Sequence, residues 1–403
     1  MAAGPTGRFG VPALDRSLGD IPAGGLVLVR HDPMVDAAPF ALQAAASHLH
    51  LGHEVVYLVS NRSPSRTLEA LEAVDSHPDR RLLHFVDAHT ALMGASDVAS
   101  YSVQNPADLA QVVARLDQAA RDHPQAVLVV DSLSGLLDHT EEARFLATLP
   151  RLQAAARKFR FCAALWTAWP YSEDMEKALS GFDAVVNLRG VEERVVLHQT
   201  MAVERSKWSG PAPPMLYKVD HPGGVLVYVP KVVVLGPASA GKTTFVHSLS
   251  GSALSVERMG TTVAMDRGTV TLDGVKVEVF GTPGQARFDP LLPTLASQAV
   301  GAILIVDASR PETFGRAKEM LQKVWKRGLR AVIALNKSDL PGALTPDEAR
   351  RRLTPPPGVD MMACVATDAA SAGVVLRKLV DDVLKSGAPA GGPGPAAQGG
   401  GAA

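Results

Sequence analysis

The stretch GPASAGKT, from Gly236 to Thr243, places two glycines, a lysine and a hydroxyl at a spacing that could bind phosphate. It fits G-x-x-x-x-G-K-[ST] at every fixed position and stands between an apolar, strand-like run and a helical stretch. In such a loop, backbone N–H groups point at phosphate oxygens, the lysine adds positive charge and the threonine can coordinate Mg²⁺. We therefore expect Thr243 as a metal ligand and phosphate contacts from Gly236, Ala238, Ser239, Ala240, Gly241, Lys242, Thr243 and Thr244.

A second motif, NKSD, follows an apolar strand-like run further along the chain and indicates which base is bound. An aspartate at its last position, Asp339, can accept hydrogen bonds from N1–H and the exocyclic amine of guanine together. Adenine presents an acceptor at N1, and an unpaired carboxylate there would cost roughly 1–3 kcal/mol or more. The sequence therefore predicts guanine binding by Asn336, Lys337 and Asp339.

These motifs, with TTVAMDRG and GTPGQARF between them, resemble the Ras-like small GTPases, and in particular the prokaryotic branch related to the MglA motility GTPase. The resemblance covers about residues 230–385 and implies a switch that binds GTP or GDP with Mg²⁺ and hydrolyses GTP. It implies that Thr262 closes over the γ-phosphate and the metal, with Thr261 as the neighbouring alternative. Further roles follow for the γ-phosphate contact (Gly284), the attacking water (Gln285) and backbone contacts to the base (Ala366, Thr367 and Asp368). Catalysis is thus expected from Gln285, Lys242 and Thr262.

The motif GTPGQ departs from the broad Ras-like pattern at Gly281, where an aspartate usually stabilises the Mg²⁺ shell. We expect slow intrinsic hydrolysis, since Ras-type enzymes already turn over on the order of 10⁻⁴ s⁻¹ without an activator. Arg267 and Arg287 could supply an activating arginine within the chain, although solvated surface arginines are the more ordinary interpretation.

The first half resembles the RecA/KaiC-like ATPase domain over about residues 8–229, through GVPALDRSLGDIPAGGLVLV, EVVYLVSNRSP and VLVVDSLSGLL. On that pattern the phosphate loop falls on residues 31–39, which hold no glycine and no lysine. Asp36 in this loop would repel a triphosphate and is expected to cap the next helix instead. The resemblance therefore implies a pseudo-ATPase.

The acidic positions of the same resemblance are also changed. The usual pair of catalytic glutamates corresponds to Asn61 and Arg62, and Asp131 alone keeps the metal-side position. Without the loop, Asp131 is expected to serve as a hydrogen-bonding residue at a strand end. The remaining use of this half would be a surface for self-association, for docking to a KaiC-like ATPase or for control of the GTPase.

Short Val/Leu-rich runs alternate with amphipathic stretches in both halves, which predicts parallel sheets covered by helices. In the first half, strands are expected at 25–30, 54–60, 82–87, 126–131, 161–167 and 184–188, and helices at 36–51, 64–76, 107–122 and 141–158. Antiparallel strands at a sheet edge should follow. The predicted fold class is α/β, with two three-layer αβα domains of the P-loop NTPase type in tandem. The domains are expected at 1–229 and 230–385, with a disordered Gly/Pro/Ala tail at 386–403.

Composition excludes several classes of function. The net charge is −1 with 20% charged residues, which disfavours nucleic-acid binding. The two cysteines, Cys162 and Cys364, are expected to be buried and reduced. No apolar stretch reaches the ~18 residues of a membrane span, and no signal core is present, so a cytoplasmic protein is expected. The histidines of HLHLGH (His48, His50 and His53) are expected to be surface residues and not metal ligands.

Two alternatives to a hydrolysing switch remain. In one, bound GTP or GDP only holds the second domain together and the chain is a non-hydrolysing scaffold, as the glycine at position 281 would allow. In the other, the second half is an ATP-driven motor, against which Asp339 argues. The resemblance also suggests a roadblock/longin-type regulator as partner.

Overall fold

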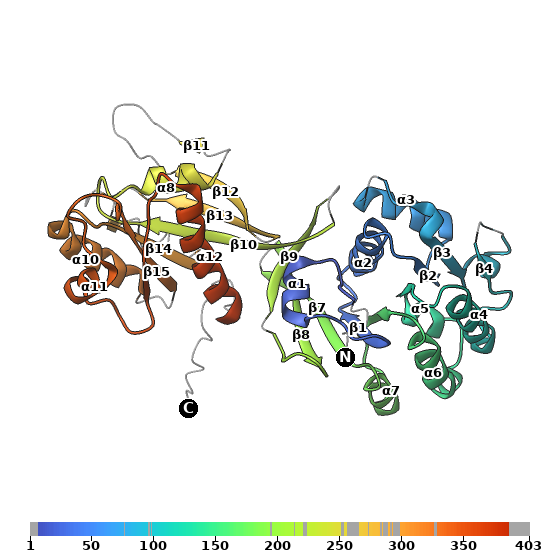
Figure 1. The fold of residues 1–403 in the computed structure, drawn as a ribbon. Coiled ribbons are helices and arrows are strands. Elements are labelled where there is room, and N and C mark those ends of the chain that lie inside the picture. The colour runs from blue at the N-terminus through green and yellow to red at the C-terminus, as the bar shows by residue number, and fades with distance from the viewer. Residues whose placement is uncertain are drawn as a thin grey trace, which may run out of the picture. The chain divides into compact units, whose positions relative to one another are not determined.

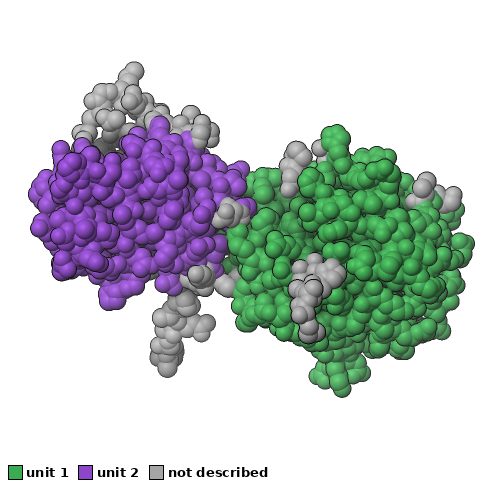
Figure 2. Space-filling model, viewed as in Figure 1, with its two compact units in different colours: residues 1–227 green, residues 228–403 purple. Residues whose placement is uncertain are grey.

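The chain is built from two compact units, Met1–Val227 and Tyr228–Ala403 (Figure 2). The computed structural model describes residues 7–75, 77–95, 97, 99–193, 196–212, 214–220, 224–250, 254–255, 266–272, 274–282, 284, 289–290, 292, 299–325 and 329–386. The chain passes from one unit to the other within β10 (Gly224–Leu235). The predicted tail lies outside the described residues, except for Ser386 at the end of the last helix.

Unit 1 contains a mostly parallel sheet with antiparallel strands at one edge. Its strand order is β4-β3-β2-β5-β6-β1-β7-β8-β9, followed by the first residues of β10, and pairing is parallel from β4 to β7 and antiparallel beyond β7. The strands are β1 (Gly25–His31), β2 (Val55–Val59), β3 (Leu83–Asp87), β4 (Tyr101–Ser102), β5 (Val127–Asp131), β6 (Phe161–Thr167), β7 (Ala184–Glu193), β8 (Val196–Ser206) and β9 (Met215–Asp220).

Helices cover both faces of this sheet (Figure 1). One face packs its alternate strand residues, such as Leu28 and Val130, against α4 and α6, while α2 contacts β2, β5 and β6. Every residue of β5 is buried, because a central strand covered on both faces has no solvent side. The helices are α1 (Pro12–Leu18), α2 (Ala38–His50), α3 (Pro64–Val74), α4 (Leu109–Asp122), α5 (Leu133–Leu137), α6 (Glu142–Ala156) and α7 (Glu173–Leu179), with 3₁₀ turns at Arg80–Leu82 and Thr90–Met93.

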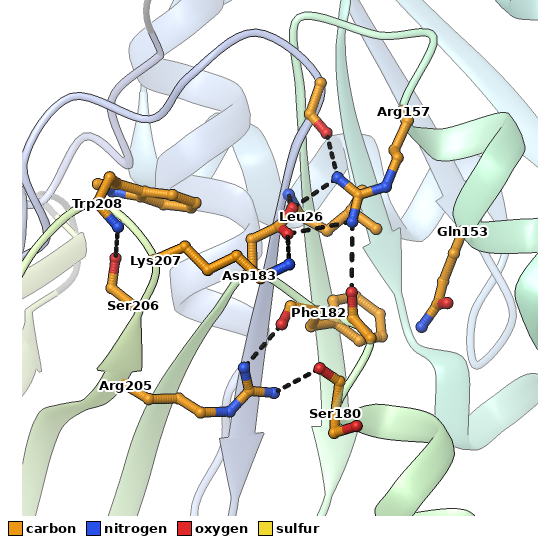
Figure 3. Close-up of polar contacts among 12 residues, drawn as sticks. Leu26, Gln153, Arg157, Ser180, Phe182, Asp183, Arg205, Ser206, Lys207 and Trp208 are labelled. Carbon is orange, nitrogen blue, oxygen red and sulfur yellow. Dashed lines mark hydrogen bonds and ion pairs between the residues drawn. The ribbon is translucent and has the colours of Figure 1, made fainter.

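A buried carboxylate ties the antiparallel edge of unit 1 to its parallel part (Figure 3). Asp183 accepts hydrogen bonds from the Leu26 backbone N–H at 3.0 Å, from Arg157 Nη1 at 2.7 Å and from Lys207 Nζ at 2.7 Å. Burial alone would raise the pKa of Asp183, but the hydrogen bonds from the two cations and the backbone hold it at about 2. The charged form is therefore stabilised where β1, β7 and β8 meet α6.

Unit 2 contains a mixed sheet of order β11-β12-β13-β10-β14-β15-β16. Its parallel part runs through β10, β14, β15 and β16, and β11, β12 and β13 pair antiparallel. The strands are β11 (Leu254–Ser255), β12 (Asp266–Leu272), β13 (Val275–Gly281), β14 (Gly301–Asp307), β15 (Arg330–Asn336) and β16 (Asp360–Ala363). One face packs against α10 (Phe314–Trp325) and α11 (Pro346–Leu353), while α12 (Ala369–Ser386) contacts β14, β15 and α8 (Lys242–Leu249); a 3₁₀ turn spans Pro311–Thr313.

The predicted fold class is confirmed: both units are α/β with mostly parallel strands, and the predicted antiparallel edge is formed by β8, β9 and β10. Each first-half strand predicted from its apolar run is present, because such runs suit a sheet buried on both faces. The helix predicted at 36–51 begins at Ala38 and ends at His50. Among the described residues, no helix combines the length and the apolar character that a membrane crossing requires.

Candidate functional site

The loop between β10 and α8 requires glycine at both of its ends. Gly236 has φ 149°, and a Cβ there would lie 2.2 Å from the Ile305 carbonyl oxygen of β14. Gly241 has φ 101°, and a Cβ there would lie 2.3 Å from Nδ2 of Asn336. The backbone of this loop therefore runs against two strand ends that only glycine lets it approach.

Lys242, the first residue of α8, folds back over this loop. Its ammonium donates a hydrogen bond to the Pro237 carbonyl at 2.7 Å and is largely buried. Burial lowers the pKa of Lys242 to about 8, and the nearby Asp266 carboxylate opposes that shift. A buried cation inside a ring of backbone groups is suited to an anionic ligand.

The residues between the two ends differ in backbone conformation and exposure. Ser239 adopts φ 62°, and its neighbour Ala238 is exposed, whereas Ala240 is buried. Thr243 and Thr244 stand in the first turn of α8 with exposed side chains. The predicted phosphate-binding residues thus form one continuous loop and helix start.

Gly284, which follows β13, lies directly against the same loop. A Cβ added at Gly284 would lie 2.6 Å from the Ala238 nitrogen and 2.6 Å from Lys242 Nζ. The structure therefore brings Gly284, expected at the γ-phosphate, against two residues of the predicted phosphate loop, Ala238 and Lys242. Gln285, Thr262, Thr261 and Arg287 lie outside the described residues.

Asn336 links the loop to the predicted base-binding segment. Its Nδ2 donates to the Ala240 carbonyl at 2.8 Å, and its Oδ1 accepts from the Ala366 backbone N–H at 2.8 Å. All three groups are buried. The first residue of NKSD therefore holds the two halves of the site together, and its predicted contact with the base stays a prediction.

Replacing Asn336 with alanine should destabilise unit 2 by about 2–4 kcal/mol, because two buried backbone groups would lose their partners at roughly 1–3 kcal/mol each. Calorimetric unfolding of the full chain should show the transition of unit 2 moving to lower temperature while that of unit 1 stays. Asp339→Ala is the matched control, because its exposed side chain should change stability by less than about 0.5 kcal/mol. Equal effects of the two changes would refute the bridging role.

The other residues of NKSD are oriented by separate contacts. Lys337 adopts φ 61°, and its ammonium pairs with the buried Asp307 carboxylate and donates to the Ser239 carbonyl at 3.2 Å. Burial tends to raise the pKa of Asp307, but the hydrogen bonds from Lys337 and Ser309 outweigh it and the pKa lies below its ordinary value. Asp339 and Thr367 are both exposed beside this framework. Their side chains are thus accessible to a base.

Asp266, at the start of β12, is a site residue that the sequence reasoning missed. It is buried beside Gly281: a Cβ at Gly281 would lie 3.2 Å from both Cβ and Oδ2 of Asp266. The carboxylate thus fills the space into which a side chain at position 281 would project, and it is close enough to affect the pKa of Lys242. The signal available in the sequence was the pairing of a glycine at 281 with an acid after TTVAM.

Arg267, considered above as a catalytic arginine, has structural contacts. Its Nη2 lies 3.2 Å from Glu278 Oε2, and its guanidinium lies 5.4 Å from the centre of the Phe280 ring. Both contacts hold the side chain on the hairpin of β12 and β13. The interpretation as a surface arginine therefore fits its surroundings.

The corresponding cleft of unit 1 lies at the carboxyl ends of β1, β2 and β5 and is lined by residues of the loop at 31–38, by Asn61 and Arg62 and by Asp131. Arg62 pairs with the buried Asp131 carboxylate, which also accepts a hydrogen bond from the Tyr57 hydroxyl at 3.0 Å. Asp36 accepts from the Ala38 backbone N–H at 3.0 Å, although the residue at the N-cap is Ala37. The Asp131 carboxylate, which would face a metal, is thus already paired with Arg62 of the same chain.

Proteins similar to this chain include members of the Arf and Ras-related families. Residues 228–385 match the model of the ADP-ribosylation factor family. An uncharacterized protein of Methanocaldococcus jannaschii is 34% identical over 110 residues, which are 27% of this chain and 71% of that protein. Ras-related protein Rab5 of Nicotiana tabacum is 33% identical over 128 residues, 30% of this chain and 64% of that protein. ADP-ribosylation factor-like protein 4D of Bos taurus is 27% identical over 172 residues, 38% of this chain and 83% of that protein.

Among solved structures, a KaiC-like protein from the hyperthermophilic archaeon Pyrococcus horikoshii is a neighbour of this chain. It matches with a TM-score of 0.45 and 14% identity, and the match covers 56% of this chain and 99% of that protein.

Proposed function

Residues 228–385 form an Arf/Ras-like GTPase domain, and we propose that unit 2 is a Mg²⁺-dependent guanine-nucleotide switch that hydrolyses GTP slowly. The resemblance to Ras-like GTPases expected from the motifs is thereby confirmed, while the MglA-related branch stays a prediction. The observation that supports the proposal best is the framework of Asn336, which joins the Lys242 loop to the segment of Ala366. Because the Asn336 side chain holds the proposed phosphate site next to the proposed base site, the arrangement suits a nucleotide, which has both groups.

The test is a titration of the full chain with fluorescent GDP, GTP and ATP analogues in the presence of Mg²⁺. We expect about one guanine nucleotide per chain. Asp339→Ala should remove the preference for guanine over adenine, because the carboxylate that pairs with both guanine donors is lost. Equal affinity of the wild-type protein for ATP and GTP would refute the proposed base specificity.

The residues around Lys242 fit a Mg²⁺-bound nucleotide. Thr243, the second residue of α8, has an exposed side chain, Thr262 is the proposed second ligand, and Asp266 is the proposed carboxylate on the metal side. When bound, Mg²⁺ would neutralise charge on the β- and γ-phosphate oxygens. In this proposal Asp266 substitutes for the aspartate that Ras-like domains carry at the position of Gly281.

Replacing Asp266 with asparagine should raise the Mg²⁺ concentration needed for tight GTP binding by about 10–100-fold, the usual effect of removing an outer-shell partner of a metal ligand. Nucleotide dissociation measured against Mg²⁺ concentration gives this value. Glu278→Gln on β13 is the control, since that acid pairs with Arg267 on the surface.

The two positions can also be exchanged. Asp266→Gly combined with Gly281→Asp should return the Mg²⁺ concentration needed for tight GTP binding to the wild-type value, because one carboxylate again reaches the same space. Gly281→Asp alone should not lower that Mg²⁺ concentration below the wild-type value, since the Cβ at position 281 would lie 3.2 Å from the Asp266 side chain. A double variant that stays as weak as Asp266→Asn would refute the substitution.

Hydrolysis is proposed to depend on Gln285, which would orient the attacking water, and on the Gly284 N–H, which would donate to the γ-phosphate. Multiple-turnover phosphate release by the wild-type protein, lost in Gln285→Leu with GTP binding retained, is the expected result. Tight GTP binding with no turnover in either protein would favour the alternative, a nucleotide-stabilised scaffold.

Unit 1 is proposed to be an inactive RecA/KaiC-like domain that receives or transmits the state of unit 2, either through a partner or through self-association. The contact of Arg62 with Asp131 supports this proposal, because it neutralises the acid that a metal would need. A roadblock/longin-type regulator is the partner to test first. GTP-dependent co-elution of such a protein with the full chain, absent in Lys242→Ala, is the expected result.

A further inference from the structure

Three side chains with metal-ligating atoms converge at the amino ends of the unit 1 strands, away from the cleft at the carboxyl ends. Glu54 immediately precedes β2, His84 is the second residue of β3, and His123 follows the last residue of α4. The ligand atoms of the three residues all lie within 4.8 Å of one another. They are drawn from three segments that the sheet order and α4 place together.

The distances suit a shared ion. Nδ1 of His123 lies 2.8 Å from Oε1 of Glu54, and Nε2 of His84 lies 3.4 Å from the same oxygen. The two imidazole rings are stacked, with centres 3.7 Å apart and planes inclined by 16°. Both nitrogens therefore lie close to one carboxylate oxygen.

A hydrogen-bonded cluster does not account for all three groups. Nε2 of His84 is buried and makes no hydrogen bond within the described part of the chain. A buried imidazole nitrogen that lies beside a carboxylate and makes no hydrogen bond is a ready ligand for a cation.

The backbone holds these ligands in place. The Val127 N–H of β5 donates to the Glu54 carbonyl at 2.9 Å, and the His123 N–H donates to the Ala119 carbonyl at 2.8 Å. His84 is fixed by strand pairing opposite Val56. The adjacent acid, Asp122, already accepts a hydrogen bond from the Tyr101 hydroxyl at 2.8 Å and is not counted among the ligands.

We propose that Glu54, His84 and His123 bind a divalent transition metal of the zinc class, with a fourth position open to water. Two imidazoles and one carboxylate form a donor set that zinc uses with an open position. Imidazole donors select zinc, copper, nickel or iron over Mg²⁺, so this metal is distinct from the one proposed in unit 2. An ion at this point would link β2, β3 and the end of α4.

The test uses the full chain stripped of metal by a chelator and then saturated with Mg²⁺ and GDP. Titration with Zn²⁺ against a chromophoric chelator should show one tight site, and Co²⁺ should give the strong visible absorption of four-coordinate geometry. Zn²⁺ should also raise the midpoint of unfolding of unit 1, because an ion bound only by the folded state stabilises it. Absence of both the tight site and the cobalt absorption, with the cluster held by hydrogen bonding only, overturns the proposal.

Variants locate the metal. His84→Ala, His123→Ala and Glu54→Gln should each weaken Zn²⁺ binding by more than about 100-fold, beyond the 10–100-fold effect of outer-shell changes. Glu54→Gln is the safest of these for folding, since its amide can still pair with His123. The control is His53→Ala, because His53 Nδ1 lies 3.0 Å from His48 Nδ1 in a second histidine pair. Zn²⁺ binding that survives Glu54→Gln and is lost in His53→Ala would place the metal at that pair and refute the proposal.

The histidine pair itself corrects an expectation. His48 was expected at the surface, but it is buried, and its Nε2 lies 2.8 Å from the Arg8 carbonyl. Burial lowers the pKa of His48 to about 4, so its partner contacts are those of a neutral ring. Its atoms are engaged in packing α2 onto the segment before α1.

Discussion

Lys242→Ala should lower the affinity of the chain for GDP and GTP by about 1000-fold, which corresponds to about 4 kcal/mol. The side chain is buried in the loop with its ammonium on the Pro237 carbonyl, so its charge faces the position where phosphate oxygens would bind. Truncating one partner of a desolvated, hydrogen-bonded charge pair costs about 2–5 kcal/mol or more. The fluorescent-nucleotide titration measures this loss directly.

The control for this change is Lys276→Ala, which removes a lysine from β13 outside the loop. It should leave the affinity unchanged. The unfolding midpoint of Lys242→Ala without nucleotide should stay close to that of the wild type, because removing a buried charge that is only partly compensated does not weaken the core. Guanine-nucleotide binding retained within tenfold in Lys242→Ala would refute the assignment of the phosphate site.

The same side chain predicts how affinity depends on pH. Because burial lowers the pKa of Lys242 to about 8, the ammonium loses its proton as the pH rises above that value, whereas its ordinary value is 10.5. Phosphate binding favours the charged form, so binding must restore the proton. Affinity should therefore fall by about tenfold per pH unit above pH 8. A flat profile between pH 7 and 10 would contradict this.

The second large effect is expected in unit 1, where Arg62→Ala should destabilise the fold by about 3–5 kcal/mol. The Asp131 carboxylate is buried and, of its two side-chain partners among the described residues, would keep the Tyr57 hydroxyl. Removing one member of a buried ion pair leaves an uncompensated charge, which carries a cost of this size. Proximity to this carboxylate and burial raise the pKa of Tyr57 well above its ordinary value, so the hydroxyl stays a donor.

Tryptophan fluorescence can report the change in the stability of unit 1 separately from that of unit 2. Of the four tryptophans, only Trp325 lies in unit 2, so urea unfolding in a Trp325→Phe background reports on unit 1. Arg62→Ala combined with Asp131→Asn should recover most of the lost stability, because no buried charge then remains. If the free energy of unfolding of Arg62→Ala is within 0.5 kcal/mol of the wild-type value, the Arg62–Asp131 pair does not stabilise unit 1.

The motifs of unit 2 predicted more of the site than those of unit 1. A phosphate loop is a local structure: glycine spacing, a lysine and a helix start within eight residues, which the loop from Gly236 to Thr243 has. The sequence therefore placed Lys242 and Gly284 correctly beside each other once the Ras-like order of motifs was known. It did not predict that the Asn336 side chain also joins the Ala240 loop to the Ala366 segment.

Asp266 shows why the rest could not be predicted. Its nearness to Gly281 follows from the antiparallel register of β12 and β13, in which Arg267 pairs with Phe280. A shift of one residue would turn the carboxylate to the other face of the sheet. The composition of neither strand specifies that register.

The sequence by itself determined the fold class and the order of strands and helices, and it located the motif that predicts a phosphate loop, because apolar periodicity and motif spacing act over a few residues. Only the tertiary structure decided that Arg62 neutralises Asp131, that Asp266 fills the space at Gly281 and that Glu54, His84 and His123 share one point. Each of these contacts joins residues of different structural segments. Their distances depend on strand order, register and helix packing, which are collective properties of the folded chain and not of any segment.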